Sequence, residues 1–210
     1  MFPPLYAILD PILTAQPLQQ VAESLVAAGV ELIQLRDKRS PAGVVFRNVK
    51  EMDARFASSR VRIIVNDRPD IAAIAGAGGV HVGQDDLPVE AARQICGDGL
   101  WVGVSTHNLA QLRDADRTSA DYIAVGPIFP TATKNNPDPV VGVDFLRAAR
   151  QLTRKPLVAI GGITVESAAD VFRAGADSVA VIRDLLVARD PAQRAHAYLA
   201  AAERARSRGA

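Results

Sequence analysis

Residues 62–107 read RIIVNDRPDIAAIAGAGGVHVGQDDLPVEAARQICGDGLWVGVSTH, a segment in which short apolar runs alternate with helix-like stretches. The runs at 62–65, 79–82 and 100–104 are rich in β-branched residues, which is typical of parallel strands buried on both faces. Between them, 69–75 and 88–95 have the length and pattern of short helices that begin at proline. The segment therefore predicts consecutive strand–helix units of a parallel sheet.

The same alternation continues in both directions until it fills the chain. Glycines such as Gly29 and Gly175 stand between a helix and the next strand, where a C-terminal cap is expected. The predicted strands are 5–9, 31–35, 62–65, 79–82, 100–104, 121–125, 156–160 and 178–182, and the predicted helices are 17–28, 41–57, 69–75, 88–95, 108–115, 143–152, 165–174 and a last one after Pro191. Eight units without a break in composition predict an α/β fold, a single-domain (β/α)₈ TIM barrel over 1–210. A doubly wound open sheet is the alternative, but it would have fewer strands and a Gly-x-Gly-x-x-Gly turn after the first strand, which this chain lacks.

Composition excludes several classes of protein. The chain has 210 residues, 49% of them apolar, and a net charge of +1, so it can bury a large core and has no basic footprint for nucleic acid. Its apolar runs are too short to span a bilayer, and the N-terminus lacks the basic region of a signal peptide. The single cysteine, Cys96, favours a buried structural thiol and a cytoplasmic location over a disulfide framework. A homo-oligomer is compatible with this composition, which does not specify the number of chains.

Polar residues gather where the predicted strands end. In a barrel these carboxyl ends form one mouth, which is where binding and catalytic residues lie. The polar strand ends are 34–38, 66–68, 83–86, 105–107, the loop 131–134, Gly161–Gly162 and Arg183–Asp184. Their coincidence predicts a functional site at this mouth.

Two carboxylates at the mouth suggest a metal ion. Asp67 and Asp86 end neighbouring strands, whose axes lie about 5 Å apart in a sheet. Two carboxylates so close repel unless a cation lies between them, and one or two carboxylates with waters and ligand phosphates is the usual Mg²⁺ site. Asp86 is weakly favoured over Asp85, and turn or helix-cap roles are the alternative for all three.

Three further groups indicate an anionic ligand. The loop 126–142 offers Thr131 and Thr133 on one face of an extended segment, followed by Lys134, although a plain solvated loop has the same composition. Arg36 and Lys38 add cations at another strand end. Gly161–Gly162 and the turn after Ile182 occupy the position where barrels bind phosphate through backbone N–H groups, or they serve only a tight turn.

The sequence offers no nucleophile or general base. His81 lies in an apolar run and is expected to be a satisfied core histidine, while His107 and His196 have no serine or carboxylate partner at a telling spacing. Chemistry must then come from positioning and from stabilisation of charge. A diphosphate leaving group held by Mg²⁺ and lysines suits a dissociative substitution at carbon.

The chain resembles the thiamine phosphate synthase family. The segments that carry the resemblance are 34–38, 66–68, 79–88, 103–107, 126–134 and 159–164, in the family's order. The resemblance implies that hydroxymethylpyrimidine diphosphate is joined to hydroxyethylthiazole phosphate, with or without its extra carboxylate, and that diphosphate is released through a pyrimidine carbocation.

The resemblance also implies roles for single residues. Asp67 and Asp86 are expected to hold Mg²⁺. The residues assigned to the pyrimidine and its diphosphate are Gln34, Arg36, Lys38, Asn66, Ser105 and Lys134, and Arg36, Lys38, Ser105 and Lys134 are the expected catalytic residues. The residues assigned to the thiazole phosphate are Thr131, Thr133, Gly162, Ile182 and Arg183.

One position departs from the family pattern. Where the family usually has serine after the last strand, this chain has Arg183 after Ile182, which puts the phosphate contact at that position in doubt. The alternatives for function are a thiazole tautomerase-like enzyme, a non-catalytic barrel that senses thiamine precursors, and a phosphosugar isomerase. The tautomerase and the sensor do not need Asp67, Asp86 and Lys134 together. The isomerase would need a strand-end Glu or Asp base opposite a histidine or cysteine, and the sequence shows no such pair.

Overall fold

A computed structural model describes residues 1–14, 16–131 and 138–207 of the chain. Strands and helices alternate along it as the sequence predicts. The strands are β1 (Leu5–Leu9), β2 (Leu32–Leu35), β3 (Arg62–Asn66), β4 (Gly79–Val82), β5 (Trp101–Thr106), β6 (Tyr122–Val125), β7 (Leu157–Ile160) and β8 (Ser178–Val181). The helices are α1 (Leu18–Ala27), α2 (Ala42–Phe56), α3 (Pro69–Ala75), α4 (Val89–Cys96), α5 (Leu109–Asp116), α6 (Gly142–Leu152), α7 (Val165–Arg173), α8 (Arg183–Leu186) and α9 (Pro191–Ser207).

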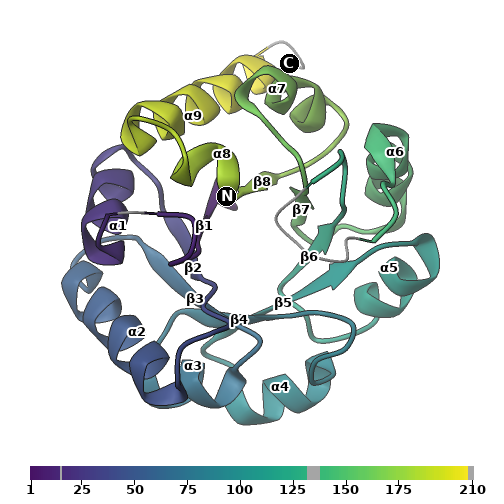
Figure 1. Cartoon of the computed structure of the whole chain (residues 1–210). Coiled ribbons are helices and arrows are strands. Elements are labelled where there is room, and N and C mark those ends of the chain that lie inside the picture. Colours follow the sequence, from purple (N-terminus) through teal and green to yellow (C-terminus); the bar gives the residue numbers. More distant parts are fainter. Residues whose placement is uncertain (15, 132–137, 208–210) are drawn as a thin grey trace.

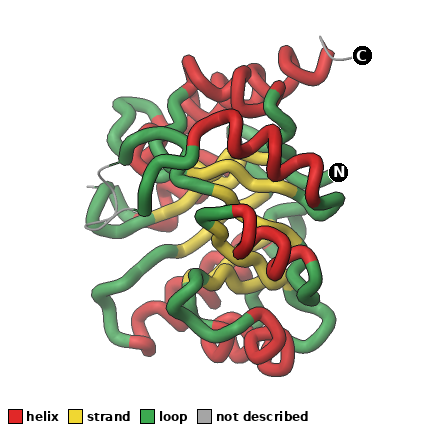
Figure 2. Tube along the Cα trace, turned by 90° about the vertical axis from the view of Figure 1, so that its right-hand side faces the viewer, coloured by secondary structure: helices red, strands yellow, loops and turns green. Residues whose placement is uncertain are grey.

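The strands close into a parallel barrel in chain order, from β1 to β8 and back to β1. Figure 1 shows the helices as an outer ring around the strands, and Figure 2 shows the barrel wall enclosed between helical layers. The prediction of a (β/α)₈ barrel is confirmed, and the open-sheet alternative is wrong because β1 pairs with β8. Among the described residues, no helix is long and apolar enough to cross a membrane.

Alternation along each strand divides the core into two parts. One set of side chains packs between the strands and the surrounding helices, and Cys96 belongs to it. Burial raises the pKa of the Cys96 thiol, as expected for a structural cysteine. The other set fills the barrel interior, and its buried members are Tyr6, Ile8, Leu32, Ile64, Tyr122, Ala124, Val158 and Ala180. Several of these hydrophobic side chains form part of the floor of the mouth.

The prediction from sequence missed one helix and made one strand too short. The short helix α8 follows β8 directly, where only a turn had been predicted. Strand β5 runs on to Thr106, because Ser105 and Thr106 pair with Ala124 and Val125 of β6. Ser105 is thus held by the sheet itself and not by a loop.

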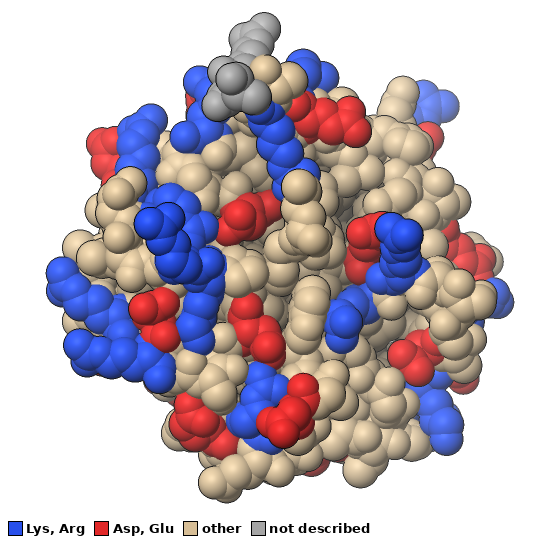
Figure 3. All heavy atoms as spheres, turned by 180° about the vertical axis from the view of Figure 1, so that it is seen from behind, with Lys and Arg blue, Asp and Glu red and all other residues tan. Residues whose placement is uncertain are grey.

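Charges are mixed on the outer surface. On the face seen in Figure 3, behind the view of Figure 1, basic and acidic side chains both occur, separated by larger areas of other residues. This mixture agrees with the net charge of +1.

Candidate active site at the mouth of the barrel

The carboxyl ends of the strands enclose a cavity of about 700 Å³. Most of the residues predicted for the site line it. These residues are Gln34, Arg36, Lys38, Asn66, Asp67, Asp86, Ser105, Thr131, Gly162, Ile182 and Arg183. The two remaining predictions, Thr133 and Lys134, lie outside the described residues. The structure thus brings together every predicted site residue that it describes.

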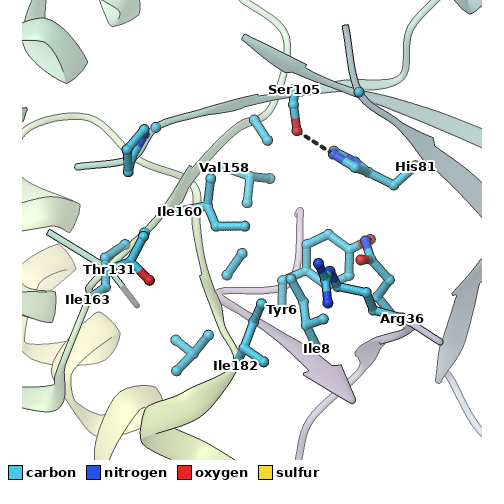
Figure 4. Close-up of a pocket in the computed structure, with 18 of the residues that line it drawn as sticks. Tyr6, Ile8, Arg36, His81, Ser105, Thr131, Val158, Ile160, Ile163 and Ile182 are labelled. Carbon is cyan, nitrogen blue, oxygen red and sulfur yellow. Dashed lines mark hydrogen bonds between the residues drawn. The ribbon is translucent and has the colours of Figure 1, made fainter. Parts of the chain in front are cut away.

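Figure 4 shows that the cavity has two sides. Arg36 lies on one side, and Thr131 and Ile163 lie on the other. The apolar side chains of Val158 and Ile160 lie between them, and they are part of the same lining. Two polar regions separated by an apolar centre suit two ligands, or a ligand with two polar ends.

Ion pairs hold the cations on the first side. Arg36 donates from Nη1 to Asp10 Oδ2 at 2.5 Å, and Lys38 Nζ lies 2.9 Å from Asp67 Oδ2. Asp10 is 3% exposed and had not been singled out from the sequence. It ends the first strand, so the strand-end argument that found the other residues also applies to it. Arg36 is fixed by this buried carboxylate and is not a freely solvated charge.

The two predicted metal ligands interact with each other. Burial raises the pKa of the Asp86 carboxyl, and the neighbouring Asp67 carboxylate raises it further. A hydrogen bond from the Gly83 N–H lowers it. That hydrogen bond joins Gly83 N to Asp86 Oδ2 at 2.8 Å and closes the turn after β4. Asp86 is therefore not the N-cap of α4, whose cap residue is Pro88 and has no side-chain hydrogen bond.

Asp67 has an unusual backbone. It has a φ of 60°, the only described residue other than glycine with a positive φ. This left-handed conformation is strained for a residue with a side chain, although Asp tolerates it better than most. Such strain gathers at binding sites, where it aims a side chain that a relaxed backbone would turn elsewhere.

A metal ion fits this arrangement by charge. Among the described residues on this side, the cavity lining and the Asp10 partner of Arg36 contribute more carboxylates than cations; they are Asp10, Asp67, Asp85 and Asp86 against Arg36 and Lys38. No group of three or more His, Cys, Asp and Glu residues arranged to hold a metal occurs in the described part of the chain. Two carboxylates and open positions for water and phosphate match Mg²⁺ better than zinc.

The second side presents backbone and small side chains. Gly161 and Gly162 have φ values of 98° and 63°, and a Cβ on Gly162 would lie 2.4 Å from the carbonyl oxygen of Pro130. The turn thus packs against the loop that leads to Thr131. Arg183 is exposed and lines the cavity at the start of α8, next to this turn.

The C-terminal helix supports this second side from behind. Tyr198 on α9 places its hydroxyl 2.5 Å from Asp184 Oδ2 and 3.0 Å from the carbonyl oxygen of Ile163. Arg194 donates two hydrogen bonds to the same Asp184 carboxylate, at 2.8 and 2.9 Å. One hydroxyl therefore joins the loop after β7 to the turn after β8.

Two histidines have partners that sequence spacing did not reveal. His81 is buried and forms hydrogen bonds with Tyr122 and Ser105, so it is a satisfied histidine as predicted, but its surroundings are polar and not apolar. His107 Nδ1 donates to the Gly126 carbonyl at 2.6 Å, and its Nε2 lies 3.5 Å from Asp138 Oδ2. The prediction that His107 lacks a carboxylate partner is wrong, because Asp138 returns to the mouth 31 positions later in the chain. His196 lies exposed on α9.

Comparison with known proteins agrees with this site. The family model described as thiamine monophosphate synthase matches residues 5–185. The chain is 52% identical over 202 residues to a thiamine-phosphate synthase of Koribacter versatilis, covering 94% of each chain. It is 43% identical over 187 residues to a thiamine-phosphate synthase of Chloroflexus aurantiacus, covering 89% of this chain and 86% of the relative. Among solved structures, it is similar to a thiamine phosphate pyrophosphorylase from Pyrococcus furiosus, with a TM-score of 0.88, 30% identity and 96% of each chain covered.

Proposed function

The chain belongs to the thiamine monophosphate synthase family and is a transferase, and we propose how the residues at its mouth carry out the synthase reaction. A pyrimidine diphosphate binds on the side of Arg36, and a thiazole phosphate binds on the side of Gly162. The carbon–oxygen bond to diphosphate breaks, and its electron pair leaves with the diphosphate. The thiazole nitrogen then gives its lone pair to the pyrimidine methylene carbon, which forms the new carbon–nitrogen bond.

The pyrimidine side works by positioning. Gln34 and Asn66 lie at the ends of β2 and β3 and hold the aminopyrimidine ring. Arg36 and Lys38 face the diphosphate, and Lys134 adds a third cation from the loop after β6. Their carboxylate partners keep Arg36 and Lys38 in place before the substrate arrives, which lowers the entropic cost of ordering them.

The thiazole side works through the backbone. The glycine turn at Gly161 and Gly162 and the start of α8 after Ile182 supply N–H groups for the phosphate. Thr131 and Thr133 supply hydroxyls, and Arg183 adds a positive charge where the family usually has serine. A positively charged contact of this kind increases both affinity and salt dependence.

The apolar centre supports a carbocation route. Val158 and Ile160 separate the two polar sides, so apolar surface surrounds the reacting carbon once both substrates fill the cavity. Exclusion of water matters because water would capture the cation in competition with the thiazole. No proton is transferred in either bond change, which agrees with a mouth whose buried histidine is already engaged in hydrogen bonds.

Mg²⁺ completes the pyrimidine side. Asp67 and Asp86 would hold it, and it would neutralise the negative charge that develops on the departing diphosphate. The excess of carboxylates over cations on this side supports a bound Mg²⁺. Without a cation, the negative charge of these carboxylates would repel the negatively charged diphosphate.

One observation supports this proposal above the others. A side with carboxylates and cations faces a side with a glycine turn, and an apolar centre separates them within one cavity. The proposal is tested by mixing the enzyme with both substrates and measuring diphosphate and thiamine phosphate, with and without Mg²⁺. We expect equal amounts of the two products, and only with the metal. Diphosphate without thiamine phosphate would mean that water captures the cation, and turnover in EDTA would exclude the role of the carboxylate pair.

Tyr198→Phe tests the support behind the phosphate site. The variant loses the hydroxyl that joins Asp184 to the Ile163 carbonyl, so the two halves of the thiazole side are no longer tied. We expect KM for the thiazole phosphate to rise about fivefold, the effect of one hydrogen bond. KM for the pyrimidine diphosphate should stay the same, and initial rates at varied concentrations of each substrate measure both constants.

Ser24→Ala is the control for Tyr198→Phe. Ser24 donates to the Val21 carbonyl within α1, so the control also loses one side-chain hydrogen bond but leaves the mouth intact. A rise of both KM values in Tyr198→Phe, or no rise at all, would contradict a specific role in the phosphate site.

Two broader features are location and assembly. The single cysteine is buried, which suits an enzyme of the reducing cytoplasm. No observation on this chain supports a particular oligomeric state, and sedimentation equilibrium would measure it.

A further inference from the structure

Five polar side chains form a continuous chain of hydrogen bonds through the barrel interior. The successive contacts are Gln34 Nε2 to Tyr6 Oη at 2.7 Å, Tyr6 Oη to Tyr122 Oη at 2.9 Å, Tyr122 Oη to His81 Nδ1 at 3.1 Å, and His81 Nε2 to Ser105 Oγ at 2.8 Å. We propose that this interior relay fixes the Ser105 hydroxyl as a hydrogen-bond donor toward the diphosphate leaving group. The inference rests on the proposed function and assigns a new positioning role to Tyr6, Tyr122 and His81.

Each hydroxyl in the relay has one proton to donate. Burial raises the pKa of both tyrosine hydroxyls, which therefore keep their protons. Both ring nitrogens of His81 have a partner in the relay, Tyr122 at Nδ1 and Ser105 at Nε2. When Tyr122 donates to Nδ1, the ring N–H is on Nε2, so His81 accepts at one nitrogen and donates from the other.

These proton counts allow only one direction once Gln34 donates. The Gln34 amide donates to the Tyr6 oxygen, so the single Tyr6 proton goes to the Tyr122 oxygen. The Tyr122 proton then goes to His81 Nδ1, which leaves the His81 proton on Nε2. His81 Nε2–H donates to Ser105 Oγ, and the proton of Ser105 is left to point into the cavity.

The opposite direction would oppose the reaction. It requires a flipped Gln34 amide, and Ser105 would then donate to His81 and turn its lone pairs toward the cavity. Lone pairs repel a diphosphate, whereas a hydroxyl donor stabilises the charge that develops on it. An anion at the mouth therefore selects the direction in which Ser105 donates.

The packing around the relay has little freedom. The His81 and Tyr122 rings are stacked with centroids 5.5 Å apart, and the Tyr6 ring meets Tyr122 edge-on at 5.9 Å. The Tyr122 ring lies directly over Gly103, where a Cβ would come within 2.0 Å of Tyr122 Cζ. Glycine at position 103 makes room for this ring. Strand β5 thus contributes to the relay twice, through the space at Gly103 and through the Ser105 hydroxyl. Figure 4 shows His81 and Ser105 facing each other at the upper end of the cavity.

The test is a double-mutant cycle on turnover with Tyr122→Phe and Ser105→Ala. Tyr122→Phe keeps the ring and removes the hydroxyl in the middle of the relay, so we expect kcat to fall about tenfold, the effect of one oriented hydrogen bond. In the Ser105→Ala background there is no hydroxyl to orient, and Tyr122→Phe should then change kcat less than about twofold. Tyr6→Phe should behave in the same way and serves as the second variant if Tyr122→Phe folds poorly.

The cycle separates this inference from the proposed function. If the wild type makes no thiamine phosphate, the proposed function fails. If the wild type is active but Tyr122→Phe costs as much in the Ser105→Ala background as in the wild type, the tyrosine is only structural and the relay is wrong. Tyr198→Phe is the matched control, because its effect on KM for the thiazole phosphate should be the same in both backgrounds.

A second readout does not depend on turnover. Nitrogen-15 NMR of the three histidines, with His81 assigned from a His81→Asn variant, reports which ring nitrogen has the proton. With Mg²⁺ and inorganic diphosphate bound, we expect His81 to be neutral with its proton on Nε2. A proton on Nδ1 would mean that Ser105 donates to His81, and the relay as proposed would be wrong.

Discussion

Asp86→Asn is expected to lower kcat by roughly 100- to 1,000-fold, the usual loss when one charge-stabilising group is removed from an active site. Asn has the shape of Asp, and its side-chain oxygen can still accept the hydrogen bond from Gly83 that closes the turn after β4. The variant therefore loses the negative charge and keeps the local structure. A series of initial rates at increasing Mg²⁺ measures the effect, and the concentration of Mg²⁺ needed for half-maximal rate should rise as well.

Asp85→Asn is the control for this charge. Asp85 lines the same cavity and stands next to Asp86 in the chain, so both variants change the net charge equally. We expect Asp85→Asn to keep most of the activity. Equal losses in the two variants would show that the general potential of the mouth matters and that neither carboxylate has the specific role of a ligand.

Asp86→Asn should also be more stable than the wild type at neutral pH. Burial and Asp67 raise the pKa of Asp86 in the folded protein, so the folded state binds this proton more tightly than the unfolded state does. The stabilisation that protonated Asp86 contributes is complete below its unfolded pKa and is lost as pH rises through its folded pKa. Thermal unfolding should show a higher Tm for Asp86→Asn at pH 7, and the difference should disappear below about pH 4, where the unfolded carboxyl is protonated as well.

The sequence was sufficient for the fold because the barrel repeats one signal eight times. Each strand is a short apolar run, and errors of one or two residues at its ends, as at β2 and β5, do not change the number or order of strands. The helix α8 was missed because four residues are too few to show helical periodicity. The glycine caps at Gly29 and Gly175 have positive φ values as expected.

The strand-end argument predicted the mouth of the barrel but not its interior. Asp67 and Asp86 meet because neighbouring parallel strands end at the same edge, which the order of the chain already implies. The relay could not be predicted in this way, because its residues lie on five strands and meet only after the barrel has closed. His81 lies between Val80 and Val82, and only the alternation of side chains along β4 directs it into the interior, away from its apolar neighbours.

Gly162→Ala is expected to reduce both the stability of the enzyme and its affinity for the thiazole phosphate. Gly162 has a φ of 63°, a left-handed conformation that costs roughly 1–2 kcal/mol for a residue with a Cβ. The added Cβ would also lie 2.4 Å from the Pro130 carbonyl oxygen and 2.8 Å from Phe129 Cβ, an overlap that costs about 1–3 kcal/mol more. Because Thr131 follows Pro130, relief of this overlap must move the loop that supplies the phosphate contacts, and KM for the thiazole phosphate should rise more than about tenfold, the effect of losing more than one hydrogen bond.

Gly76→Ala separates the two costs. Gly76 is the left-handed C-cap of α3, with a φ of 76°, and a Cβ there would meet only Asp53 Oδ2, at an ordinary contact distance of 3.9 Å. This control should lose only the roughly 1–2 kcal/mol of the backbone conformation and keep both KM values, because it precedes β4 and so lies at the end of the barrel opposite the mouth. Urea unfolding gives the free energies, and initial rates give the KM values. If Gly162→Ala is less stable than Gly76→Ala but still binds the thiazole phosphate normally, then the turn after β7 does not form the phosphate site, because the loop carrying Thr131 would have moved without consequence.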